Sequence, residues 1–134
     1  MSDRPVATHV HSPGFLALVT EARARVREID IPDYLAAHGK GQHPVLVDVR
    51  EDHEWNAGRL PGAMHLGKGI SERDIEKHFP DHDTPLVCYC GGGFRSVLVC
   101  ENLQRMGYRN ARSLVGGYRG WIAAGHPIET DETE

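Results

Sequence analysis

The feature that most constrains the fold is a series of short apolar runs separated by segments with helical periodicity. The run at residues 44–50 reads PVLVDVR, and two further runs occupy residues 86–89 and 111–115. Continuous apolar strands of this kind are typical of a parallel sheet that is buried on both faces. Residues 28–29 and 63–66 are weaker strand candidates.

Helical segments are expected between these strands. The clearest predicted helices cover residues 72–79, 96–106 and 118–124, and a small helix at residues 34–37 could be capped by Asp30 or Asp33. Strands that alternate with helices imply an α/β domain with a parallel sheet and helices on both faces. A chain of 134 residues suits one such domain.

The two ends of the chain differ from this core. Residues 1–12 are polar, and we expect a flexible leader, although His9 and His11 could ligate a metal. Residues 13–27 predict an amphipathic helix, because apolar side chains recur at helical spacing after a Ser-Pro start. Its apolar face should pack on the domain, and a contact between two copies of a homodimer is the alternative. The acidic tail, residues 129–134, is expected to be disordered.

Charge, cysteine content and the N-terminal sequence limit the binding partners and the cellular location that we expect for this protein. The chain has 15 Lys and Arg against 19 Asp and Glu, which does not suggest a protein that binds nucleic acid or a membrane surface. No apolar run follows Arg4, so a signal peptide is not expected. Three cysteines cannot all pair within one chain, which is consistent with a reducing compartment. We therefore expect a cytoplasmic protein.

One loop contains both a candidate nucleophile and the positive groups that could stabilise an anion. The strand at residues 86–89 leads into CGGGFRS at residues 90–96, which opens the clearest helix. Ligands of parallel sheets bind at this end of the strands. Consecutive glycines let backbone N–H groups point inward around an anion, and the helix start and Arg95 add positive charge. All of these features favour the thiolate of Cys90, which makes it the candidate nucleophile.

Four motifs in the same order resemble those of single-domain rhodanese-like sulfurtransferases. Residues 90–96 match the C-x-x-G-x-R-[ST] loop of that family. Residues 46–51 (LVDVRE), 58–63 (GRLPGA) and 116–121 (GGYRGW) resemble its flanking motifs, with Arg59 where the family commonly has His. The resemblance covers about residues 29–128, so we place a rhodanese-like domain at residues 28–128, with the predicted N-terminal helix outside it.

The resemblance implies a five-stranded parallel sheet and a sulfur-transfer reaction. Cys90 would take a sulfane sulfur from thiosulfate or a similar small anion and pass it from a persulfide to a thiol or to cyanide. The substrate-binding residues would be those of the loop: Gly91, Gly92, Gly93, Phe94, Arg95 and Ser96. Arg95 would orient the sulfonate, and Ser96 would cap the helix or donate to the sulfur. No metal or cofactor is expected.

Loop length separates this activity from its nearest alternative. Four residues stand between Cys90 and Arg95, whereas cysteine phosphatases have one more. The shorter ring suits a single sulfur better than a tetrahedral phosphate or arsenate. A phosphatase or arsenate reductase is therefore the less favoured enzyme, and a non-catalytic rhodanese-like binding module is a further alternative.

Other residues are expected to support the site. Asp48 and Arg50 should form ion pairs that brace the pocket wall, and Arg59 either adds positive field or faces solvent. Phe94 should point outward and shape the rim, where it could select the acceptor. We expect Cys88 and Cys90 to project to opposite faces of the sheet, with Cys88 and Cys100 buried. A C-x-C zinc site is not expected, because no second pair completes four ligands.

Trp55 and Trp121 are interpreted as packing residues rather than as platforms for a substrate.

Overall fold

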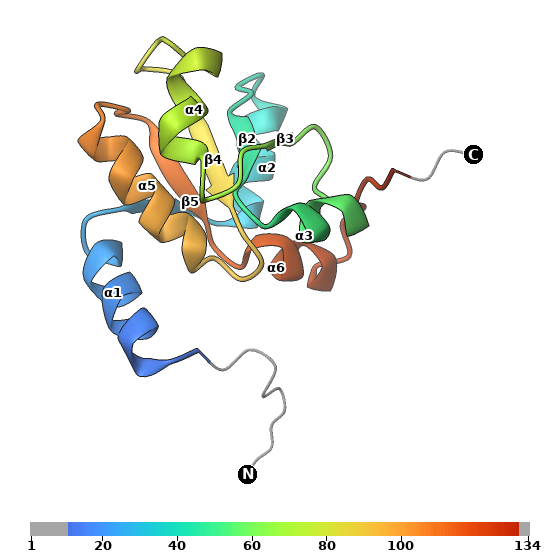
Figure 1. Cartoon of the computed structure of the whole chain (residues 1–134). Helices are drawn as coiled ribbons and strands as arrows, with labels where there is room; N and C mark the ends of the chain where they lie inside the picture. Colours follow the sequence, from blue (N-terminus) through green and yellow to red (C-terminus); the bar gives the residue numbers. More distant parts are fainter. Residues whose placement is uncertain (1–10, 132–134) are drawn as a thin grey trace.

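A computed structural model describes residues 11–131 and contains one five-stranded sheet (Figure 1). The strands are β1 (Arg27–Ile29), β2 (Val45–Asp48), β3 (Met64–His65), β4 (Leu86–Tyr89) and β5 (Ala111–Leu114). All neighbouring strands are parallel, in the order β1-β5-β4-β2-β3. The predicted sheet is confirmed, including its two weaker strands.

The central strand β4 carries the candidate nucleophile to the carboxyl edge of the sheet. It pairs with β2 on one side and β5 on the other, and Asp48 of β2 is in register with Tyr89. Because both strands end together, the residues after Asp48 and Tyr89 meet at one edge. Arg50 and Cys90 are thereby brought to the same region.

Six helices surround this sheet in the described part of the chain: α1 (Pro13–Arg23), α2 (Ile31–Gly39), α3 (Asp52–Ala57), α4 (Ser71–His78), α5 (Arg95–Arg105) and α6 (Gly117–Ala123). One apolar cluster joins α1, α4 and α5 to one face of the sheet, and a second joins α2 and α6 to the other face. Helices therefore cover both faces, as predicted.

Alternation along β4 distributes its side chains between the two clusters. Leu86 and Cys88 belong to the first cluster, whereas Val87 and Tyr89 belong to the second. Cys90 returns to the first cluster. The expectation that Cys88 and Cys90 project to opposite faces is wrong, because residues two apart on a strand share a face.

The N-terminal helix α1 begins where the Ser-Pro pair predicted but ends at Arg23, four residues early. Its buried side chains, Val19 and Ala22, join the cluster that α5 forms with the sheet, so the expected packing on the domain is confirmed. Residues 1–10 of the predicted leader, including His9, lie outside the described residues.

The start of the predicted tail is held against the domain. The backbones of Arg59 and Glu129 exchange hydrogen bonds of 2.9 and 2.8 Å, and Asp131 forms an ion pair with Arg59. Disorder is therefore the wrong prediction for residues 129–131. None of the helices between residues 11 and 131 is long and apolar enough to cross a membrane.

Helix α3 was missed from the sequence. Its N-terminus forms a capping box, in which the Glu51 side chain accepts from the N3 backbone and Glu54 accepts from the Glu51 N–H. The six-residue helix buries no side chain, so it lacks the apolar periodicity by which longer helices are found.

Candidate active site

The loop from Cys90 to Phe94 is held by the start of α6. The Tyr118 N–H donates to the Cys90 carbonyl over 2.8 Å, and the Arg119 N–H donates to the Gly91 carbonyl over 2.9 Å. This approach requires glycine at position 117, where φ is +55° and an added Cβ would lie 2.3 Å from the Cys90 oxygen. The Gly-Gly pair at residues 116–117 thus joins α6 to the nucleophile loop.

Cys90 is buried, with 1% of its surface exposed, and its sulfur lies within the loop. The Gly93 N–H donates to it over 3.2 Å, and the Ser96 Oγ lies 3.6 Å away. Burial acts to raise the pKa of the thiol, but hydrogen bonds from Ser96 and from the Gly93 and Gly92 amides outweigh it and lower the pKa below its usual value. These contacts therefore favour the thiolate of Cys90 more than the surroundings of a free cysteine do.

The Ser96 hydroxyl contacts the Cys90 sulfur and does not cap the helix. Phe94 is the N-cap of α5, and no side chain caps that helix end. The Ser96 Oγ is instead 2.7 Å from the Oγ of Ser113 on β5. With both hydroxyls buried, Ser113 can donate to Ser96 while Ser96 donates to the sulfur. Ser113 was missed, because no local pattern relates β5 to the loop.

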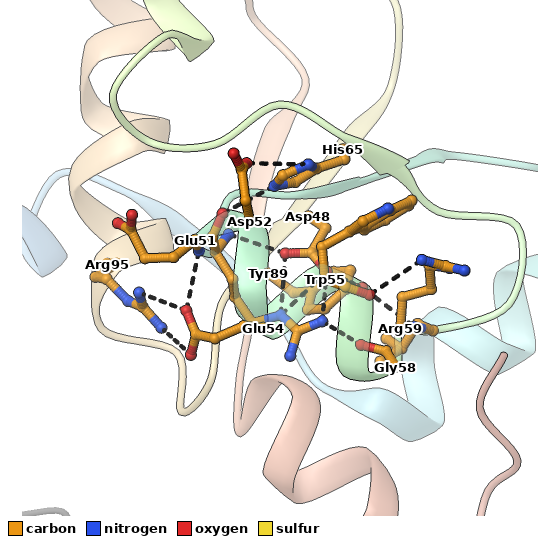
Figure 2. Close-up of polar contacts among 12 residues, drawn as sticks. Asp48, Glu51, Asp52, Glu54, Trp55, Gly58, Arg59, His65, Tyr89 and Arg95 are labelled. Atoms are coloured by element: carbon orange, nitrogen blue, oxygen red, sulfur yellow. Dashed lines mark hydrogen bonds and ion pairs between the residues drawn. The ribbon is translucent and has the colours of Figure 1, made fainter. Parts of the chain in front are cut away.

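Arg95 is bound by a carboxylate that the sequence did not single out. Its two terminal nitrogens donate to the two Glu54 oxygens over 3.0 and 3.1 Å (Figure 2). Burial acts to raise the pKa of Glu54, but the Arg95 guanidinium and the Glu51 N–H hold it below its usual value. The capping box of α3 therefore also supplies the counter-ion of Arg95.

Asp48 and Arg50 form the predicted brace. The Arg50 guanidinium donates to both Asp48 oxygens at 2.8–3.0 Å and to the Gly58 carbonyl at 2.6 Å, and the pair is buried. Tyr89 completes the network by donating to Asp48 over 2.6 Å, while burial raises the pKa of its phenol. The Arg50 guanidinium lies 4.1 Å from the Tyr118 ring centroid, so the brace also supports α6 beside the loop.

Neither expectation for Arg59 is correct. The side chain is buried against the Trp55 ring, donates to the Trp55 carbonyl and forms an ion pair with Asp131. Figure 2 shows it on the far side of Glu54 from Arg95. Its charge is neither exposed to solvent nor directed at the loop.

Phe94 is half-buried at the rim, where it contacts α1. Its ring lies 6.4 Å from the Phe15 ring, 4.7 Å from the His11 ring and 5.3 Å from the Arg23 guanidinium. Phe94 thus lies between the loop and α1. The motif resemblance did not include this helix.

The remaining thiols and tryptophans agree with their predicted structural roles. Cys88 and Cys100 are buried and, like Cys90, not in disulfides, and Trp121 is buried with its indole N–H on the Pro127 carbonyl. Trp55 stacks on His65 at 4.9 Å. Between residues 11 and 131 there is no group of three His, Cys, Asp or Glu side chains placed to hold a metal.

Comparison with known proteins agrees with this geometry. A family described as the rhodanese-like domain matches residues 31–124. The chain is 35% identical over 89 residues to the thiosulfate sulfurtransferase GlpE of Actinobacillus succinogenes, covering 66% of this chain and 78% of that protein. The corresponding protein of Coxiella burnetii is 31% identical over 83 residues, covering 62% and 75%.

Solved structures show the same fold. A Rhodopseudomonas palustris protein described as of unknown function, a possible tyrosine phosphatase, is 31% identical with a TM-score of 0.78, covering 90% of this chain and 98% of that one. The human single-domain sulfurtransferase is 24% identical with a TM-score of 0.65, covering 73% and 96%. The loop geometry, the family match and the similarity to thiosulfate sulfurtransferases together show that this chain belongs to the rhodanese-like family and is a thiosulfate sulfurtransferase-like enzyme.

Proposed function

We propose that the protein moves a sulfane sulfur from thiosulfate, or a similar small anion, to a thiol or to cyanide through a persulfide on Cys90. The Cys90 thiolate attacks the outer sulfur of thiosulfate, a new S–S bond forms, and the old S–S bond breaks with its electron pair leaving on sulfite. The acceptor then attacks the terminal persulfide sulfur and restores the thiolate. Both steps are exchanges at sulfur, so neither needs a metal, a redox cofactor or a separate base.

The observation that carries this proposal is the set of donors around the Cys90 sulfur. Gly92, Gly93 and Ser96 all donate toward the sulfur of a residue that is 1% exposed. Fixed donors in a site that excludes water stabilise a buried anion without the reorganisation that solvent requires. The same donors suit the negative terminal sulfur of a persulfide, which would extend from Cys90 into the loop.

Intact-mass measurement after incubation with thiosulfate tests the proposal. We expect the wild-type chain to gain the mass of one sulfur atom, and Cys90→Ser to gain none. Peptide mapping should place the added sulfur on Cys90 and not on the buried Cys88 or Cys100. Adding cyanide should then remove the adduct and release thiocyanate. Absence of an adduct with thiosulfate and with other sulfane donors would contradict the proposal and favour a non-catalytic binding module.

Phosphatase activity is the second candidate, since it appears in the description of the similar Rhodopseudomonas palustris protein. The four-residue spacing between Cys90 and Arg95 argues against it, and so does the occupation of Arg95 by Glu54. A phosphatase needs that guanidinium for the phosphoryl oxygens. Hydrolysis of an aryl phosphate by wild type but not by Cys90→Ser would support the second candidate. We expect no such turnover.

A further inference from the structure

A second guanidinium, that of Arg119 on α6, lies directly against the nucleophile loop. A Cβ added to Gly92 would be 2.3 Å from the Arg119 Nη2, and one added to Gly91 would be 2.7 Å from its Nη1. The backbone of Arg119 is anchored at the same place by its hydrogen bond to the Gly91 carbonyl. The two glycines therefore leave the space that this side chain occupies.

Two guanidiniums converge on one peptide of the loop. The Arg95 Nη2 lies 3.4 Å from the same Cβ position on Gly91 that the Arg119 Nη1 approaches. Like charges gather in this way at sites for anions, because an anion between them removes their repulsion. The convergence is one residue along the chain from the Cys90 thiol.

The two arginines differ in how their charge is compensated. Arg95 gives both terminal nitrogens to Glu54. The Arg119 side chain is exposed, and within residues 11–131 no hydrogen bond or ion pair joins its guanidinium to a carboxylate. The uncompensated positive charge at the loop is therefore that of Arg119.

We propose that Arg119 binds the anionic end of the sulfur donor. This inference rests on the proposed sulfur transfer and names the residue that selects its donor class, which comprises small donors with a sulfonate or carboxylate. The planar fork of Arg119 pairs with two oxygens of the donor while the loop amides hold the sulfur that moves. Arg95, whose fork is paired with Glu54 and whose guanidinium also interacts with the Cys90 thiol, keeps the loop and α3 together.

Alkylation of Cys90 tests the anion site without any sulfur transfer. The rates with iodoacetate, an anion, and with the neutral iodoacetamide are measured by mass spectrometry of the Cys90 peptide. Both reagents form the same type of S–C bond with loss of iodide, so their ratio isolates the effect of reagent charge. We expect Arg119→Ala to lower the iodoacetate-to-iodoacetamide ratio about three- to tenfold, the range for one partly solvated charge pair.

Two further variants separate charge from structure. Arg119→Lys should retain most of the wild-type iodoacetate-to-iodoacetamide ratio, because a cation remains at this position. Arg105→Ala, which removes an exposed charge at the other end of α5, should leave the ratio unchanged. The preference for iodoacetate should also fall as salt is raised. An unchanged ratio in Arg119→Ala would overturn the assignment.

Kinetics with thiosulfate connect the site to turnover. Arg119→Ala should raise the KM for thiosulfate by a similar factor and alter turnover with an uncharged organic polysulfide much less. If wild type forms no adduct with thiosulfate but Arg119→Ala lowers the alkylation ratio, the proposed function fails and the anion site stands. If the adduct forms and Arg119→Ala changes neither the ratio nor the KM, the anion site fails and the proposed function stands.

Discussion

Removal of the Ser96 hydroxyl should make the Cys90 thiolate harder to form. In the wild type this hydroxyl lies 3.6 Å from the sulfur and can be oriented by Ser113 at 2.7 Å. A hydrogen bond to a charged group contributes about 1.5–3 kcal/mol, and the long contact suggests the lower end of that range. In Ser96→Ala the pKa of Cys90 should rise, and the thiolate fraction at a fixed pH below it should fall about tenfold.

The assay is the pH dependence of Cys90 alkylation by iodoacetamide, followed on the Cys90 peptide. The curve for Ser96→Ala should move to higher pH, while the plateau at high pH stays near the wild-type value. Ser71→Ala is the matched control, because its hydroxyl is buried but bonds the Lys68 carbonyl and not the sulfur. This control should leave the curve in place.

A second measurement separates reactivity from stability. Ser96→Ala leaves the buried Ser113 hydroxyl without the partner it has in the wild type, which should cost about 1–3 kcal/mol of unfolding free energy. Ser96→Ala combined with Ser113→Ala should recover part of that loss without restoring the pKa of Cys90. Identical alkylation curves for wild type and Ser96→Ala would refute the role given to the hydroxyl, since the amides alone would then set the pKa.

Three further predictions concern the supports of the loop. Asp48→Asn leaves the buried Arg50 charge uncompensated and should lower the unfolding free energy by about 3–5 kcal/mol in denaturant melts; a loss under about 1 kcal/mol would show that Arg50 finds other partners. Gly117→Ala should abolish persulfide formation, because its Cβ would lie 2.3 Å from the Cys90 oxygen, whereas Gly125→Ala, also at positive φ but in open space, should retain it. The pKa of Glu54 is lowered in the folded state, so its stabilising effect is present above its unfolded pKa and is lost as the pH falls through the folded value; the stability difference between wild type and Glu54→Gln should therefore shrink below about pH 4.3, and a constant difference would contradict the pairing with Arg95.

Local sequence patterns were sufficient for the elements that carry their own periodicity. The β-branched runs predicted the strands, and the apolar stripe at residues 96–106 predicted α5 to within a residue or two at each end. The short α3 was missed because it buries nothing, and because its capping box has Glu51 at the N-cap, where the usual sequence signature has Ser, Thr, Asp or Asn. The end of α1 was misplaced because the apolar spacing continues to Val26, which is buried just before β1.

Contacts between segments that are far apart in the chain could not be predicted from local sequence patterns. Glu54 lies 41 residues from Arg95 and Ser113 lies 17 residues from Ser96, so nothing in either neighbourhood marks them as partners. Arg59 was misjudged for the same reason, since its counter-ion is 72 residues away.

The sequence by itself determined the sheet, the candidate nucleophile and the chemical character of its loop, because strand periodicity and the spacing of Cys90, the glycines and Arg95 are local properties. The tertiary structure alone decided which charge near that loop is compensated. Folding places Glu54 on Arg95 and leaves Arg119 against Gly91 and Gly92. A guanidinium acts on a substrate according to the carboxylates that surround it in space, and only the packing of α3 and α6 around the carboxyl end of β4 sets those neighbours.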